Sequence, residues 1–228
     1  MKRKLLSALL ATAMTMTVVA GTGIAVSADG EAVVSTVMFS DPDTMDPGRA
    51  DDDQKNSIVL ECQETLVRLI DGKLTNAGAE SYETSDDGLV WTFHLRDNKY
   101  SDGTPVVAED YVNSIRRVFD PEVNCHNAGI FYCIAGGEAF NTGSGAKEDV
   151  GAKAIDDKTL EITLTEPIPY FAQLLTFANI TPVPESKTEG ENNSSYGAIV
   201  DDLAQCGPYY ISEWTRGSKV VLKKNPNY

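Results

Sequence analysis

The chain holds few of the residues that usually perform catalysis. Its only histidines are His94 and His126. A Ser-His-Asp triad needs a histidine that faces both a nucleophile and a carboxylate. His94 lies in a stretch where apolar and polar residues alternate, and His126 directly follows Cys125, although neighbours in sequence rarely face each other. The sequence therefore predicts a protein that is not an enzyme, with an exported hydrolase as an open alternative.

Motifs for phosphate, metal and cofactor binding are also missing from the sequence. The stretch "GSGAK" at 143–147 lacks both the leading glycine spacing and the final Ser or Thr of a P-loop. The stretch "DPDTMD" at 41–46 has no glycine at the sixth position, which a calcium-binding loop requires. No C-x-x-C pair occurs that would indicate a zinc site. We therefore expect neither a cofactor nor a bound metal.

Residues 1–28 have the pattern of a secretory signal peptide. Three basic residues at positions 2–4 precede an apolar stretch at 5–20, and Val26-Ser27-Ala28 offers small residues at the positions that a signal peptidase recognises. The apolar stretch is too short and too interrupted for a membrane span. We expect cleavage after Ala28. Thr22 stands where a bacterial lipoprotein has its lipidated cysteine, so no lipid anchor is expected. We therefore expect an exported protein that is extracellular, at the cell surface or in a periplasm.

The charge of the chain is strongly negative. It has 34 acidic and 19 basic residues, a net charge of -15. Such a chain repels phosphate backbones, so nucleic acid is excluded as a partner. The acidic excess fits either an ordinary solvated surface or a preference for cationic ligands.

The four cysteines suggest disulfide bonds, because an even number in an exported protein usually pairs. They are Cys62, Cys125, Cys133 and Cys206, for which three pairings are possible. Cys125 and Cys133 are close in sequence and flank an apolar pair at 131–132. Cys125–Cys133 is therefore our disulfide candidate.

Periodicity predicts a mixed α+β fold. Apolar residues alternate along 89–96 and 160–165, which is typical of half-buried strands. An apolar stripe at helical spacing covers 109–119, and another covers 58–67. We also expect a strand at 32–39 and a short helix within 167–177. A hairpin is expected at 207–225, around Arg216-Gly217. The stretches 136–149 and 182–195 are expected to be loops. The strands and helices do not alternate regularly enough for a doubly wound sheet.

An ordered set of motifs gives the chain a resemblance to a known family. The motifs are "TMDPGRADD", "AESYETSDDGLVWTFHLRDNKYSDGTPVVAEDYVNSIRRVFDP", "VGAKAIDDKTLEITLTEPIPYF", "PVP" and "GPYYISEWTRGSKVVLKKNPNY". Residues 33–228 resemble the extracellular solute-binding proteins, family 5, of ABC importers. The resemblance implies a periplasmic-binding-protein-like fold of the class II, cluster C type, and a monomer whose partners are a peptide ligand and ABC permease and ATPase subunits.

The resemblance also implies a domain division. We expect the first part of lobe I at 29–62 and 185–228, and an inserted α+β subdomain at 63–184. Family members continue well beyond "NPNY", so the second lobe is expected to be missing from this chain. The stretch 91–120 then belongs to the inserted subdomain and serves mostly as scaffold.

Seven ligand-binding residues follow from the same resemblance. The first group is Asp51, Asp52 and Asp53, where a carboxylate could pair with the amino terminus or a basic side chain of a peptide. Acidic residues before a helix are equally explained by the helix dipole. Asn127 stands where an oligopeptide-binding relative has an aromatic residue. The last group, just before the hairpin, is Cys206, Gly207 and Tyr209.

Four functions remain open at this point. A peptide receptor of an ABC importer is our prediction. The alternatives are a receptor of the same family for nickel, an opine or a saccharide, a secreted adhesin or sensor without a transport role, and the exported hydrolase.

Overall fold

The chain divides at Phe39 into two units, Met1–Phe39 and Ser40–Tyr228. The computed structural model describes residues 23–26 and 32–228. In the first unit, strand β1 (Gly23–Val26) pairs with β2 (Ala32–Ser35) in antiparallel register. The predicted cleavage after Ala28 and most of the predicted signal peptide lie outside the described residues.

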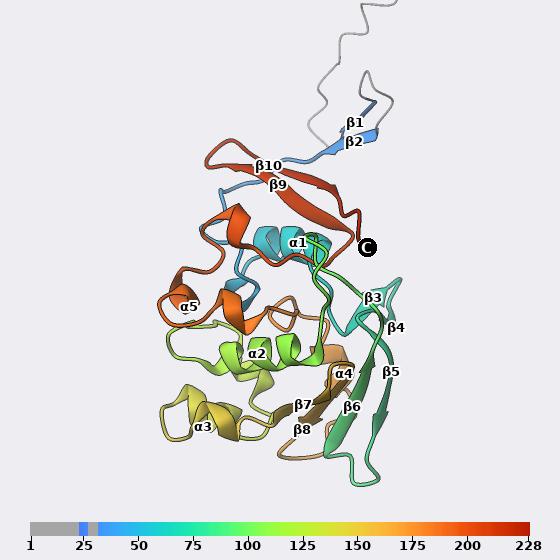
Figure 1. Cartoon of the computed structure of the whole chain (residues 1–228), viewed down its shortest axis with the longest axis vertical. Helices are drawn as coiled ribbons and strands as arrows, with labels where there is room; N and C mark the ends of the chain where they lie inside the picture. The colour runs from blue at the N-terminus through green and yellow to red at the C-terminus, as the bar shows by residue number, and fades with distance from the viewer. Residues whose placement is uncertain (1–22, 27–31) are drawn as a thin grey trace, which may run out of the picture. The chain divides into compact units, whose positions relative to one another are not determined.

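The sheet with the most strands among the described residues is four-stranded and antiparallel. Its strand order is β5 (Ala79–Thr84), β6 (Val90–Leu95), β8 (Thr159–Thr163) and β7 (Ala152–Asp156) (Figure 1). Along β6, buried residues alternate with half-buried ones, and Trp91, Phe93 and Leu95 are the buried set. This alternation confirms the strand predicted at 89–96.

Helix α2 (Ala108–Phe119) packs against β7 and β8. Its buried stripe and the inward side chains of β6 belong to one hydrophobic core, which confirms the predicted helix and its face. The side chain of Asp110 starts the helix, because Oδ2 accepts the Val107 N–H at 3.0 Å. The Tyr100 hydroxyl donates to the same oxygen at 2.9 Å, which connects the Ser-Asp-Gly-Thr-Pro turn to the helix.

Helix α1 (Asp53–Cys62) ends five residues earlier than the apolar spacing predicts. Gln63 adopts an extended conformation, and the chain enters the hairpin of β3 (Val67–Ile70) and β4 (Lys73–Asn76). Leu66 and Val67 are fully buried, so their apolar character marks core burial and not a continuing helical face. A short 3₁₀ turn, Pro47–Arg49, precedes α1.

The last strands form the predicted hairpin. β9 (Tyr209–Thr215) pairs with β10 (Lys219–Lys224), and Gly217 adopts a φ of 66° in the turn between them. The predicted loops at 136–149 and 182–195 contain short helices that no periodicity indicates. The remaining elements are the helices α3 (Gly137–Asn141), α4 (Phe171–Leu174) and α5 (Asn192–Ser195) and the 3₁₀ turns Ala128–Phe131, Lys147–Asp149, Glu185–Lys187 and Val200–Asp202.

Helices and antiparallel strands together confirm the α+β class. The division into a lobe at 29–62 and 185–228 and a subdomain at 63–184 stays a prediction. Among the described residues, no helix combines the length and the apolar character that crossing a membrane requires.

Candidate functional site

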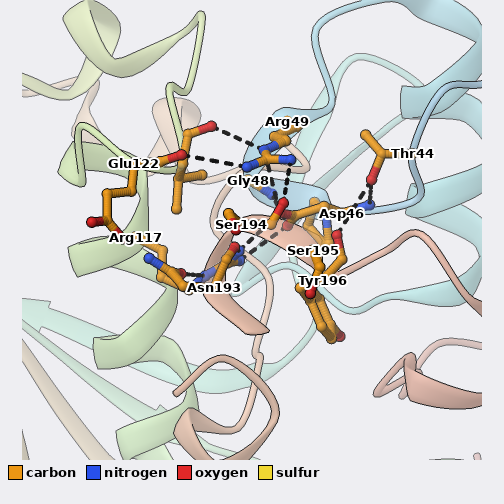
Figure 2. Close-up of polar contacts among 12 residues, drawn as sticks. Thr44, Asp46, Gly48, Arg49, Arg117, Glu122, Asn193, Ser194, Ser195 and Tyr196 are labelled. Carbon is orange, nitrogen blue, oxygen red and sulfur yellow. Dashed lines mark hydrogen bonds and ion pairs between the residues drawn. The ribbon is translucent and has the colours of Figure 1, made fainter. Parts of the chain in front are cut away.

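The segment 44–53, called here the first loop, is anchored by a buried ion pair. Asp46 accepts hydrogen bonds from Arg117 Nη1 at 3.0 Å and Nη2 at 2.8 Å, and its Oδ1 also accepts the Gly48 N–H at 2.9 Å (Figure 2). The two side chains are 0% and 4% exposed. A paired, two-point contact of this kind fixes both distance and orientation. The first loop is thereby attached to the end of α2.

Further groups surround the Arg117 guanidinium. Asn193 Oδ1 accepts from its Nε at 2.9 Å, and the Tyr196 ring lies 5.3 Å from the guanidinium carbon. Burial by itself lowers the pKa of Arg117, but the hydrogen bond and charge of Asp46 outweigh it and raise that pKa overall. The guanidinium is therefore charged and has a structural role.

Lys55 is a buried cation within the first turn of α1. Its ammonium contacts Asp43 at 3.0 Å, Asp52 at 3.4 Å and also Asp51, while only 7% of its side chain is exposed. Burial lowers the pKa of Lys55, but the hydrogen bonds that its ammonium donates to Asp51 and Asp43 outweigh this effect and raise that pKa overall. In return, the hydrogen bond from Lys55 lowers the pKa of Asp43.

The three acids predicted as ligand-facing have three different roles. Asp51 pairs with Lys55. Asp52 caps α1, since its Oδ1 accepts the N–H groups of residues 54 and 55 at 2.9 and 2.8 Å. Asp53 opens the helix, and none of the ion pairs or side-chain hydrogen bonds among the described residues involves its carboxylate. The helix-start explanation therefore accounts for Asp52. All three acids are exposed, and Asp53 is the one whose carboxylate has no such contact within the described part of the chain.

The segment 120–127, called here the second loop, meets the first loop through two amides. Asn127 Nδ2 donates to Asn179 Oδ1 at 2.9 Å and to the Ala50 carbonyl at 3.3 Å. Asn179 Nδ2 donates to the carbonyls of Pro47 at 2.9 Å and Ala50 at 3.3 Å. Two segments that sequence reasoning chose separately are thus neighbours in space.

A polar pocket of about 290 Å³ lies between the two loops. Its lining residues are Asp43, Arg49, Asp51, Lys55, Val123, Asn124 and His126. The two carboxylates and the two cations balance, so the pocket offers both charges and both kinds of hydrogen-bonding group. Sequence reasoning missed Arg49, Lys55 and Asn179. Only Lys55 had a local signal, because it lies four residues after an acidic residue, Asp51, which is a spacing typical of ion pairs.

Cys206, Gly207 and Tyr209 lie elsewhere, at the opposite end of α1. The Gly207 N–H donates to the Cys62 carbonyl at 2.9 Å, and Asn98 Nδ2 donates to the Cys206 carbonyl at 3.1 Å. A Cβ on Gly207 would lie 2.6 Å from the backbone of Cys62, so only glycine fits there. A ten-residue helix is about 15 Å long, which separates this group from Asp51–Asp53. The seven predicted residues therefore form two groups.

All four cysteines are free thiols, so the predicted Cys125–Cys133 disulfide is wrong for this structure. The 3₁₀ turn Ala128–Phe131 separates the two residues and gives their thiols different surroundings. Burial raises the pKa of Cys125 to about 11, with Asp46 and Asp51 nearby. Burial also raises the pKa of Cys133, whose acidic neighbour is Glu166.

What the site can do chemically follows from its side chains. Among the described residues, no group of three or more His, Cys, Asp or Glu side chains is placed to hold a metal ion. The pocket combines fixed carboxylates, fixed cations and one histidine, a set suited to binding polar groups of either charge.

Comparison with known proteins matches most of this unit to one family. Residues 73–228 match the model of the bacterial extracellular solute-binding proteins, family 5 Middle. The chain is 34% identical over 201 residues to the oligopeptide-binding protein OppA of Bacillus subtilis, and the match covers 87% of this chain and 37% of that protein.

Solved structures show the same likeness. The substrate-binding domain of an oligopeptide ABC transporter from Bacillus anthracis matches 85% of this chain with a TM-score of 0.80 and 34% identity. Listeria monocytogenes OppA bound to peptide matches 83% with a TM-score of 0.77 and 35% identity. In both cases the chain covers 38% of the solved protein, so it spans little more than a third of the length of these relatives.

Proposed function

The chain belongs to the bacterial extracellular solute-binding proteins of family 5, and from this membership we propose that it serves to capture peptides for an ABC importer. The observation that carries the proposal is the polar pocket between the first and second loops. Asp51 of the first loop lines this pocket. Asn127 of the second loop lies beside the pocket and donates a hydrogen bond to the Ala50 carbonyl. Likeness to the family indicates both residues.

A peptide suits the chemistry of this pocket. Peptides carry an ammonium group, a carboxylate and a regular series of N–H and C=O groups, whereas the pocket presents carboxylates, cations and amide groups. Charge-assisted hydrogen bonds to such groups are the strong polar contacts in binding sites. Because the charges in the lining balance, the pocket has no excess negative charge that would favour a simple cation. The peptide-binding relatives support peptide over nickel or another small solute.

The remaining parts of the proposal concern the setting of the protein. It is exported by a signal peptide cleaved after Ala28 and works at the cell surface or in a periplasm as a monomer. ABC permease and ATPase subunits take the ligand from it. An oligopeptide-binding protein and the substrate-binding domain of an oligopeptide ABC transporter are among the relatives, and they support the transporter partners.

Thermal unfolding with and without peptide tests the proposal. The secreted protein is mixed with a pool of short synthetic peptides, and the control is the same mass of free amino acids. A ligand at a hundredfold excess over its Kd stabilises the folded state by about 2.7 kcal/mol. We expect a raised melting temperature with peptides only. An equal rise with amino acids or with Ni²⁺, or no rise with any of them, would contradict the peptide proposal.

A further inference from the structure

Arg49 joins the first loop to two other segments. Its Nε donates to the Val123 carbonyl at 3.0 Å, its Nη1 to the Ser194 carbonyl at 2.8 Å and its Nη2 to the Glu122 carbonyl at 3.4 Å (Figure 2). All three nitrogens of the guanidinium are thus engaged by backbone. The partners lie 73 to 145 residues away in the sequence, so these contacts close large loops of chain.

This arginine lines the pocket, but three of its five N–H groups are already used. Its side chain is 28% exposed, and its Nε lies 4.0 Å from the buried Asp46 carboxylate. Arginine is the residue whose rigid, planar fork can satisfy several acceptors in fixed geometry. A guanidinium held in this way contributes mainly by fixing its partners in place and has few donors left for a ligand.

The two loops need such a connection because both are irregular backbone. No strand or helix ladder joins them, and the separation of irregular segments is set by side-chain hydrogen bonds to their backbone groups. Asn127 of the second loop donates directly to the Ala50 carbonyl, and Asn179 connects Pro47 and Ala50 to Asn127. Arg49 makes a separate connection, to the carbonyls of Glu122 and Val123. Val123 and Arg49 themselves line the pocket.

We infer that Arg49 is a positioning residue of the ligand site, which sets the separation of the two loops and thereby the width of the pocket. The inference rests on the proposed function, because it assumes that the pocket receives a peptide. A site that is held open at the right width before binding loses less free energy when the ligand enters. Lysine cannot replace Arg49, since a single ammonium group cannot reach three separated carbonyls.

The test compares Arg49→Gln and Arg49→Lys with the control Arg68→Gln in the full chain. Arg68 is a matched control because 25% of its side chain is exposed, and it donates to Glu64 Oε1 at 2.7 Å and to the carbonyls of Leu60 and Gln63 at 3.0 and 2.8 Å. These partners lie at the other end of α1 from the pocket. Three quantities are measured for each variant: melting temperature, hydrogen exchange at 122–127, and affinity for the peptide that the wild type retains from a synthetic pool.

Both Arg49 variants should weaken peptide binding roughly tenfold, through lost preorganisation, and speed hydrogen exchange at 122–127. Arg68→Gln should lower the melting temperature about as much as the Arg49 variants do. It should leave the peptide affinity within about twofold of the wild type, because distant sites act independently. If Arg49→Gln or Arg49→Lys binds the peptide as tightly as the wild type does, the positioning role is overturned and the proposed function is not affected. The same affinity loss in Arg68→Gln would also overturn the positioning role, since general destabilisation then explains the effect. A wild type that retains no peptide would overturn the proposed function and the positioning role together.

Discussion

Replacing Asp46 by asparagine should destabilise the protein strongly. The substitution keeps the size of the side chain but removes its charge, while Arg117 remains buried and charged. Arg117 now donates to both carboxylate oxygens of Asp46, at 2.8 and 3.0 Å. Asparagine has an NH₂ group in place of one of these oxygens. At that position the NH₂ group and the guanidinium are both donors, so one hydrogen bond is lost. The Gly48 N–H also competes for the remaining oxygen.

The size of the effect follows from burial. Each hydrogen bond to a charged group contributes about 1.5–3 kcal/mol. Breaking one partner of a buried ion pair costs about 3–5 kcal/mol, because the other charge is left uncompensated. Both side chains are almost fully buried, so no discount for solvent screening applies. We therefore expect Asp46→Asn to lower the free energy of unfolding by about 3–5 kcal/mol.

Urea unfolding followed by tryptophan fluorescence measures this change. The control is Asp53→Asn, which removes the same charge seven residues along the chain at an exposed position. It should change stability by less than about 0.5 kcal/mol. The double variant Asp46→Leu with Arg117→Met should recover part of the loss, because it leaves no buried charge. A loss below about 1 kcal/mol in Asp46→Asn would refute the view that this pair anchors the first loop.

Three further predictions concern the core, the helix start and the thiols. Trp91→Ala should lower stability by about 3–5 kcal/mol in urea unfolding without changing the order of peptide preference; a changed preference at unchanged stability would contradict its scaffold role. Asp52→Ala should cost about 1 kcal/mol through its lost helix cap, whereas Asp53→Ala should cost much less, and equal losses would contradict the separate roles of the two acids. Cys133 is only half-buried, whereas burial raises the pKa of Cys125 to about 11, so mass spectrometry should find Cys133 alkylated first in the native protein at pH 8. Unfolding without a reductant should expose all four thiols, and only two would indicate a disulfide.

Much of the fold could be predicted because local patterns decided it. The alternation along β6 and the stripe on α2 each belong to one surface that packs into the core. The end of α1 could not be predicted, because Leu66 and Val67 continue its apolar spacing. The extended conformation of Gln63 depends on distant partners, since its Nε2 donates to the Ala204 carbonyl, 141 residues away.

The candidate site was predictable only in part for the same reason. Likeness to the family identified Asp51 and Asn127, and the structure places them beside one pocket. Arg49 and Asn179 escaped prediction because their partners are backbone carbonyls 73 to 145 residues away, which leave no pattern in sequence. The Cys125–Cys133 prediction failed because closeness in sequence does not report which way side chains point across a 3₁₀ turn.

The length of α1 has a consequence for how the protein can be altered. Asp51 and Asp52 lie at one end of the helix, and Gly207 contacts the other end, about 15 Å away. Changes at sites separated by more than about 10 Å, with no shared partner, usually add without interacting. The two ends can therefore accumulate substitutions independently. An engineer or a natural lineage can rebuild one end while the other keeps its properties.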